Sequence, residues 1–267
     1  MALYELKMPY GIGFLLVDEI LELNSNAMTI TTSWEVKRGL QLHLAGHFPR
    51  PDKPIFPGVM GIQLIAESAG LPGFRISGLQ GVNFNGTIGP GEILATAYLH
   101  SDKPEYEVEP TPCQVNGRLT KSPGKVVCQV HCMYLETTEE PTTFLLKDPA
   151  ELAGVPHLYT GNEILFPRGP ALPNSVLAEH MCQSVVAMNA HTAAFQGKKF
   201  FLTGIPEANF FSDVPWGDTV VSKGRIQLNQ QDPRLGVASV ETYLDEAPIA
   251  MMEMSFAAVR SRQATPA

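Results

Sequence analysis

The sequence predicts an α+β chain in which two antiparallel sheets each wrap round one long buried helix. Three observations support this fold class. The chain contains two copies of an internal repeat, each copy has one apolar segment of helical length behind a proline, and the rest of each copy resembles short strands separated by turns. With 267 residues, the chain is long enough for two modest domains. We therefore expect a pseudodimer within one chain, with one unit at residues 1–145 and the other at 146–267.

Two pairs of segments carry the repeat. SGLQGVNFNGTIGPGE begins at Ser77 and TGIPEANFFSDVPWGD begins at Thr203, and both place Asn-Phe and then Gly-acid at identical spacing. Upstream of these, HFPRPDKPIFPG begins at His47 and LFPRGPALPN begins at Leu165. Both upstream segments combine Phe-Pro-Arg with a later proline that opens a helix. Two diverged copies of one unit of about 120 residues account for both pairs.

Each unit is expected to contain one helix and a set of strands. The helix of the first unit is expected at residues 58–69 and that of the second at 174–191. The first helix is apolar on nearly all sides, which is typical of a helix that strands enclose. In the first unit, strands are expected at 13–23, 27–36, 79–84, 92–100, 113–120 and 125–136. In the second unit, strands are expected at 204–211, 218–228, 235–244 and 249–260.

Composition and charge exclude several classes of protein. The net charge is −8 and there is no block of Lys or Arg, so we expect no binding to nucleic acid or to an anionic membrane surface. No stretch approaches 18 apolar residues, and the first residues lack the pattern of a secretory signal, so the expected location is the cytoplasm. The four cysteines have no CxxC spacing, and we expect no metal site.

The segment from His47 to Gly70 resembles the signature of a known family. That family is the hotdog-fold β-hydroxyacyl-acyl-carrier-protein dehydratases of fatty-acid and polyketide synthesis, in which His-Phe-Pro precedes a Pro-Gly-Val turn and a buried helix. Here His-Phe-Pro begins at His47 and Pro-Gly-Val begins at Pro57. The resemblance implies a double hotdog, with an active site shared between two hotdogs. One hotdog supplies the histidine, and the helix of the other supplies an acid six residues after its opening proline.

When the family's spacing is applied to each half, the halves are complementary. The first half has His47, but Gln63 stands at the position of the acid. The second half has Glu179 at the acid position, but Leu165 stands where the histidine should be. The resemblance therefore implies one complete site formed by His47 and Glu179, and one degenerate site that contains Gln63 and Leu165.

The chemistry of dehydration explains these residue types. A base must remove the proton from C2 of a 3-hydroxyacyl thioester, and an acid must protonate the hydroxyl that leaves C3. His47 is suited to be the base because imidazole titrates near neutrality, and Glu179 can hold a proton or orient the departing water. Backbone N–H groups at the start of the first helix, above all that of Gly58, are free to stabilise the thioester oxygen. Gln183, one turn after Glu179, is spaced to orient the carboxyl, and the resemblance implies this role too.

The resemblance implies a substrate and a partner. The substrate is a (3R)-3-hydroxyacyl thioester, the product is the trans-2-enoyl thioester, and no cofactor is required. An acyl carrier protein is the expected carrier, and because it is acidic it should dock on basic residues. The candidates for this basic surface are Arg50, Lys53, Arg168, Lys198 and Lys199. The candidates for the lining of the acyl tunnel are Phe84, Met188, Phe210 and Phe211. Acyl chain length and association of pseudodimers into a homodimer stay open.

Three other functions fit the same residues. One is a dehydratase that also isomerises the trans-2 double bond to cis-3, another is a hotdog thioesterase, and the third is a non-catalytic acyl-binding scaffold. Convergence of His47 and Glu179 across one pocket would argue against the scaffold. The first helix also carries Glu67, four residues after Gln63, but we do not expect it to restore the degenerate site, which lacks a base. His180 is expected on the helix surface, and Cys182 is expected to be core filler.

Overall fold

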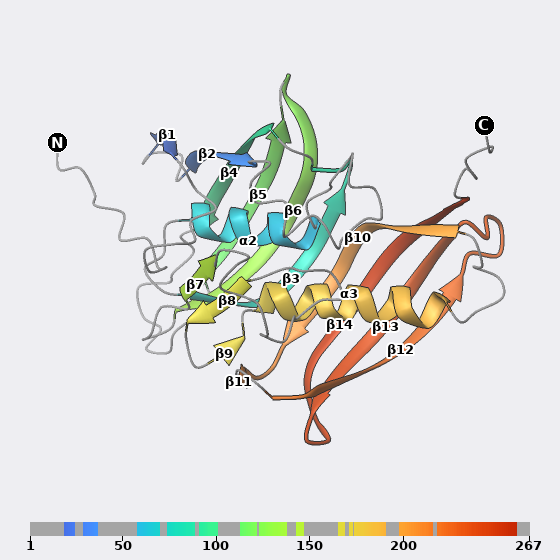
Figure 1. The fold of residues 1–267 in the computed structure, drawn as a ribbon. Helices are drawn as coiled ribbons and strands as arrows, with labels where there is room; N and C mark the ends of the chain where they lie inside the picture. The colour runs from blue at the N-terminus through green and yellow to red at the C-terminus, as the bar shows by residue number, and fades with distance from the viewer. Residues whose placement is uncertain are drawn as a thin grey trace.

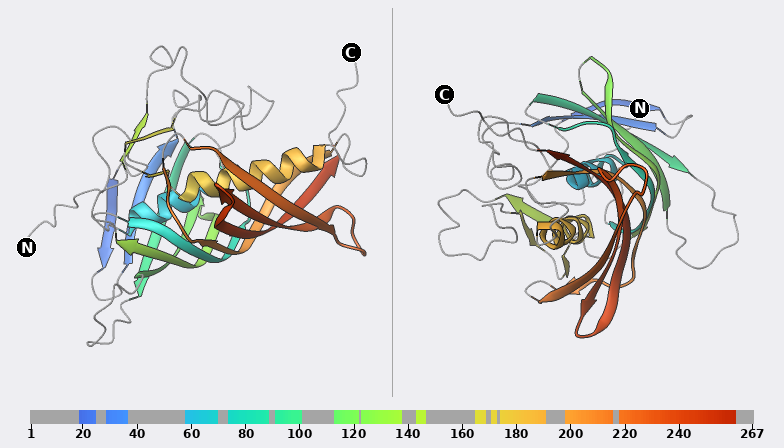
Figure 2. Two further views of the ribbon diagram at one scale, coloured as in Figure 1. Left: turned by 90° about the horizontal axis from the view of Figure 1, so that it is seen from below. Right: turned by 90° about the vertical axis from the view of Figure 1, so that its right-hand side faces the viewer.

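The structure is a computed structural model, and ten of its strands form one antiparallel sheet (Figure 1). The strand order is β1-β2-β4-β5-β6-β3-β10-β14-β13-β12, so strands of the first half occupy one side and strands of the second half the other. The sheet curves round both helices, which are seen nearly end-on in the right panel of Figure 2. The residues described are 19–24, 29–36, 58–69, 74–88, 91–100, 113–121, 123–137, 143–146, 165–168, 171–172, 174–190, 198–215 and 218–260.

The elements agree with the predicted order in both halves. The helices are α2 (Gly58–Ser68) and α3 (Asn174–Ala190). The strands of the large sheet are β1 (Glu19–Asn24), β2 (Thr29–Val36), β3 (Phe74–Phe84), β4 (Gly91–His100), β5 (Cys113–Lys121), β6 (Lys125–Thr137), β10 (Lys198–Phe210), β12 (Val220–Leu228), β13 (Leu235–Leu244) and β14 (Ala247–Arg260). Two further pairs join β7 (Thr143–Leu146) to β8 (Leu165–Arg168) and β9 (Ala171–Leu172) to β11 (Val214–Pro215).

Strands β3 and β10 begin several residues earlier than the sequence indicated. The predicted starts were Leu79 and Gly204, each at or directly after a glycine of the repeat. In the structure, both glycines lie within a continuous strand at positions where the pairing register shifts. Glycine here marks an irregularity inside a strand, and not its beginning.

The internal repeat forms the centre of the sheet. β3 pairs with β10 in an antiparallel register that places Gly78 opposite Asn209 and Gly204 opposite Asn83. Because the repeat aligns the two glycines with each other and the two asparagines with each other, this pairing has pseudo-twofold symmetry. It also joins the two predicted sheets into one. A Cβ at Gly204 would lie 2.7 Å from the carbonyl oxygen of Val82, so glycine allows this close approach.

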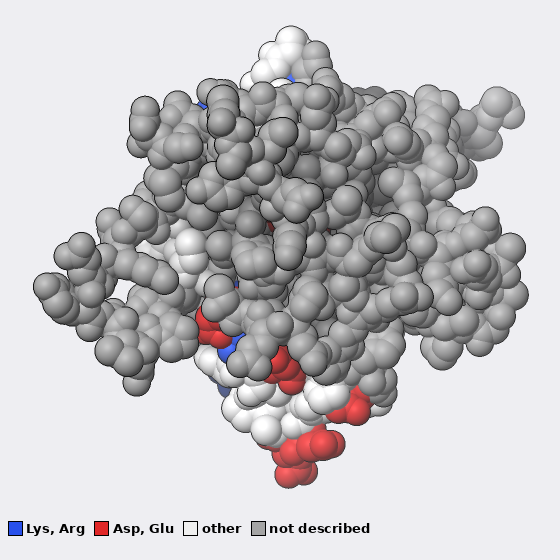
Figure 3. All heavy atoms as spheres, turned by 90° about the vertical axis from the view of Figure 1, so that its left-hand side faces the viewer, with Lys and Arg blue, Asp and Glu red and all other residues white. Residues whose placement is uncertain are grey.

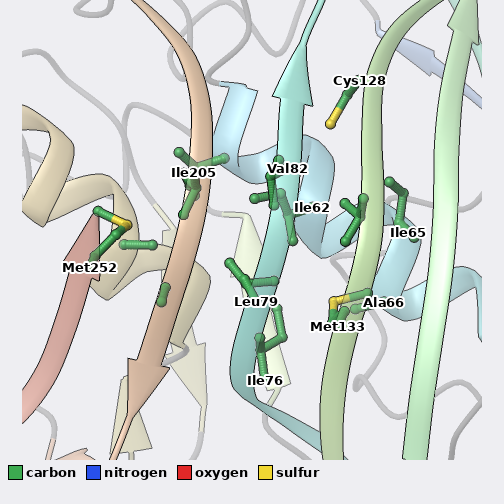
Figure 4. Close-up of a cluster of buried hydrophobic side chains, with 14 of the residues drawn as sticks. Ile62, Ile65, Ala66, Ile76, Leu79, Val82, Cys128, Met133, Ile205 and Met252 are labelled. Carbon is green, nitrogen blue, oxygen red and sulfur yellow. The ribbon is translucent and has the colours of Figure 1, made fainter. Parts of the chain in front are cut away.

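Helix α2 is enclosed by the strands of its own half, as its apolar sequence predicted. A Cβ at Gly61 would lie 2.6 Å from the side chain of Leu119 on β5, and one at Gly117 would overlap Ile65 of α2. Glycines on both sides of this contact therefore let the helix lie close to the sheet. Figure 4 shows a buried cluster in which side chains of α2 and of β3, β6, β10 and β14 lie together. The core is thus shared between the two halves.

Candidate active site

Glu179 is a buried carboxylate on the second helix. Its side chain lies in α3 and is 3% exposed. One turn later, the Nε2 atom of Gln183 donates a hydrogen bond of 2.8 Å to the Oε1 atom of Glu179. Residues four apart lie on the same face of a helix, and a buried carboxylate requires polar partners. The predicted contact between Gln183 and Glu179 is therefore present.

Helix α2 has the same pair of groups in the opposite order. Gln63 and Glu67 are 3% and 1% exposed, and the Nε2 atom of Gln63 lies 3.4 Å from the Oε1 atom of Glu67. The amide thus precedes the acid in α2, whereas the acid precedes the amide in α3. Glu67 is thus the hydrogen-bond partner of Gln63 inside α2.

A second hydrogen bond shows that this reversal is not a shift in helix register. The hydroxyl of Ser68 donates to the carbonyl oxygen of Leu64 over 2.7 Å in α2. The hydroxyl of Ser184 donates to the carbonyl oxygen of His180 over 2.9 Å in α3. These two serines stand at equivalent positions, one residue after Glu67 and Gln183. The two helices are therefore aligned, and the acid and the amide have exchanged places.

Gly58 is the first residue of α2, where N–H groups lack partners within the helix. A Cβ at this position would lie 2.9 Å from the ring of Phe84, so glycine lets the ring pack against the helix start. Of the aromatic residues predicted to line a tunnel, Phe84 is therefore beside the start of α2. Phe210 is buried, and Phe211 is exposed. For Met188, only the backbone is described.

Two of the predicted site residues lack a described side chain. His47 lies outside the described residues, so its approach to Glu179 stays a prediction. The backbone of Leu165 is described as the first residue of β8, where it pairs with Leu146. The degeneracy of the second site therefore also stays a prediction, which rests on the identities of Gln63 and Leu165.

The predicted basic surface is described only in part. Arg50 and Lys53 lie outside the described residues, and only the backbone of Arg168 and Lys199 is described. Lys198 is partly buried. In Figure 3, acidic side chains gather at the lower end of the described surface, and few basic ones are visible. A docking surface for an acidic partner stays a prediction.

Three features of α3 were not identified from the sequence. Its first residue, Asn174, is buried, and its Nδ2 atom donates a 2.8 Å hydrogen bond to the carbonyl oxygen of Ile76 on β3. The next residue, Ser175, is also buried. His180 is partly buried, so its predicted surface position is wrong, and desolvation lowers its pKa. The only sequence signal was that Asn174 replaces the glycine that opens α2.

Cys182 is packed against the core, as predicted. Burial raises the pKa of its thiol well above the ordinary value, and the nearby charge of Glu179 raises it further. A thiol in this environment stays protonated and is a poor nucleophile.

Two kinds of feature are absent from the described residues. They contain no group of three His, Cys, Asp or Glu side chains that could hold a metal ion. Within the same part of the chain, neither helix is long and apolar enough to cross a membrane.

Comparison with known proteins identifies relatives by sequence. No family model matches the chain. A 3-hydroxyacyl-[acyl-carrier-protein] dehydratase FabZ of Idiomarina loihiensis is 39% identical over 74 residues, which cover 26% of this chain and 44% of that protein. The chain therefore matches less than half the length of this relative. A FabZ of Polynucleobacter asymbioticus is 28% identical over 134 residues, covering 46% of this chain and 87% of that protein.

Comparison with solved structures shows the fold. A dehydratase domain from the CurJ module of curacin polyketide synthase has a TM-score of 0.57 at 11% identity, covering 95% of this chain and 98% of that one. The dehydratase domain of polyketide PpsC from Mycobacterium tuberculosis has a TM-score of 0.55 at 15% identity, covering 92% and 98%. A putative oleoyl thioesterase from Lactobacillus plantarum has a TM-score of 0.55 at 9% identity, covering 90% and 99%.

These likenesses define the chain as a double hotdog. The sequence relatives confirm its kinship with the hotdog-fold β-hydroxyacyl-acyl-carrier-protein dehydratases, which the segment beginning at His47 had suggested.

Proposed function

We propose that this chain dehydrates (3R)-3-hydroxyacyl thioesters, carried on acyl carrier protein, to trans-2-enoyl thioesters. The FabZ relatives carry the name of this reaction, and polyketide synthase dehydratase domains share the fold. A single composite site does the chemistry, with His47 from the first half and Glu179 from the second.

One observation carries the proposal: the buried pair of Glu179 and Gln183 in α3. The carboxyl is almost fully buried and held by a 2.8 Å hydrogen bond. It stands at the family's acid position in one half, while the family's histidine stands in the other half. If the two halves had lost catalytic residues independently, a histidine in one half and the matching acid in the other would not be favoured.

Each residue has a defined task in the reaction. His47 removes the C2 proton, and Glu179 protonates the C3 hydroxyl, which leaves as water. The N–H groups at the start of α2, beginning at Gly58, stabilise the negative charge that develops on the thioester oxygen. Gln183 keeps the carboxyl of Glu179 in one orientation. All bonds are formed and broken between substrate and protein groups, so the chemistry requires no redox cofactor.

A thioesterase is the second candidate, because a putative oleoyl thioesterase has the same fold over nearly the whole chain. A hotdog thioesterase uses a carboxylate to activate water, so Glu179 would serve either reaction and His47 only dehydration. Further isomerisation of the product to the cis-3 isomer would use the same two residues as dehydration.

The test is hydration of a trans-2-enoyl thioester, the reverse reaction, followed by the loss of enoyl ultraviolet absorbance. Release of free thiol is measured in the same samples and reports thioester hydrolysis. We expect hydration by the wild type, near-complete loss in Glu179→Gln and His47→Ala, and little change in Gln63→Glu.

The other outcomes discriminate the alternatives. Thiol release without hydration would identify the activity as that of a thioesterase and contradict the dehydratase proposal. Binding without turnover, on carrier-protein substrates of several lengths, would replace it by an acyl-binding scaffold.

A further inference from the structure

We propose that the end of the molecule with the degenerate site has become a lock that positions Glu179 for the working site. The lock is the hydrogen bond from Asn174 of α3 to the carbonyl oxygen of Ile76 on β3, supported by the ion pair of Arg75 and Asp213. The catalytic part of this inference rests on the proposed function.

Two neighbouring residues of β3 bind the second half. The carbonyl oxygen of Ile76 accepts the buried 2.8 Å hydrogen bond from Nδ2 of Asn174. The Nη1 atom of Arg75 lies 2.9 Å from Oδ1 of Asp213, in the segment that follows β10. Arg75 also pairs with Glu136 on β6 over 2.6 Å, which holds the guanidinium against its own half. Asn174 thus fastens the start of α3 to the first half of the chain, and Arg75 links the same strand to the segment after β10.

The start of α2, which the pseudo-twofold symmetry relates to the start of α3, cannot make these contacts. The counterpart of Asn174 is Gly58, which has no side chain and packs against Phe84. In the repeat alignment, Phe201 stands in the place of Arg75, and Thr87 in the place of Asp213. The start of α2 therefore has a glycine against Phe84, whereas the start of the helix that carries Glu179 has an anchor.

Stability alone does not explain an asparagine at position 174. Its Oδ1 atom is buried and, among the described residues, receives no hydrogen bond. A buried acceptor without a donor opposes folding, and this cost offsets much of what the bond from Nδ2 contributes. A leucine, which has the same branched shape, would avoid this cost, although it would leave the Ile76 carbonyl oxygen without this donor. What asparagine provides and leucine cannot is a directional hydrogen bond between α3 and β3.

The link acts on catalysis through geometry. Asn174 lies five residues, less than two turns, before Glu179 on the same helix. Anchoring the helix start therefore limits how far the Glu179 carboxyl can slide or rotate relative to the first half of the chain. The first half carries His47. Small misplacements of a catalytic group cause large losses of rate. Asn174 is thus a positioning residue.

The test compares Asn174→Leu with Asn116→Leu. Asn116 also has a buried Oδ1 atom without a described donor, but it lies on β5, where the neighbouring Gly117 faces α2 and Asn116 consequently faces away from it. We expect Asn174→Leu to keep the melting temperature of the wild type, to lower kcat for enoyl hydration by about 10- to 100-fold, and to change KM by less than about twofold. We expect Asn116→Leu to keep kcat. Asn174→Ala is the substitute if the leucine variant does not fold.

Hydrogen exchange separates this inference from the proposed function. If the wild type is active, an unchanged kcat in both Asn174 variants overturns the inference. A loss of kcat that is fully explained by a smaller folded fraction overturns it as well. If the wild type is inert, the proposed function fails, and the anchor is tested by exchange of the amides from Asn174 to His180. At least about tenfold faster exchange in Asn174→Leu, but not in Asn116→Leu, supports the anchor. Equal exchange overturns it.

Discussion

Helices α2 and α3 bury the same kinds of groups but arrange them differently. Each has one carboxyl, one amide four residues away and one serine bonded back to a carbonyl. In α2 the amide comes first, and in α3 the acid comes first. An exchange of the two residues keeps a polar pair inside each helix, so the polar groups stay paired in the core. Under the proposed function, the same exchange removes one catalytic position. A pseudodimer can therefore lose a site without losing the fold.

The strongest test of this comparison reverses the pair in α3. The double variant Glu179→Gln, Gln183→Glu gives α3 the order found in α2 and keeps its composition. We expect kcat for enoyl hydration to fall by about 1000-fold or more, because the acid moves one helical turn away from its position. Steady-state kinetics measures the effect, and circular dichroism checks the fold.

The matched control makes the same exchange in α2. Gln63→Glu, Glu67→Gln gives that helix the order of α3, but Leu165 still provides no base at the second site. We expect kcat to stay within about 1.3-fold of the wild type. An increase approaching a doubling of active sites, or equal losses in both exchanged proteins, would contradict the assignment of one working site.

The second test breaks the symmetry at the centre of the sheet. Gly204→Ala would place its Cβ 2.7 Å from the carbonyl oxygen of Val82, and a backbone atom paired in a central strand has little room to move. We expect a loss of about 2 kcal/mol in the free energy of unfolding, measured by urea denaturation. Gly86→Ala is the control, because its closest contact would be an ordinary 3.4 Å from Val127. A similar cost at both positions would refute the close-approach argument.

The sequence was sufficient to predict the repeat, the two buried helices and the acid–amide pair of α3. Local patterns determine these features: apolar helices behind a proline, and residues four apart on one helix face. It was insufficient for the early starts of β3 and β10, because pairing between the halves holds glycines within the strands. The anchor at Asn174 was missed because its acceptor, Ile76, is 98 residues away and is only a backbone carbonyl.

A third test removes the amide from each helix separately. Gln183→Leu and Gln63→Leu both take a hydrogen bond from a buried carboxyl, which costs about 1.5 kcal/mol of folding stability at most positions. The bond in α2 is longer, 3.4 Å against 2.8 Å, so we expect the smaller loss for Gln63→Leu. We expect kcat to fall by about tenfold only in Gln183→Leu, since only that amide orients a catalytic acid. Equal kcat values for the two variants would remove Gln183 from the site.

The smallest expected effect concerns the position after each helix's acid site, which is His180 in α3 and Leu64 in α2. Burial lowers the pKa of His180 below its ordinary value of 6.5, so the unfolded chain takes up a proton at a higher pH than the folded chain does. This histidine therefore lowers the free energy of unfolding as the pH falls below about 6.5, and has no such effect above it. His180→Leu gives α3 the residue of α2 and should make the decline shallower. Urea denaturation at about pH 8 and about pH 5 measures the difference, and an unchanged decline would mean that other groups cause it.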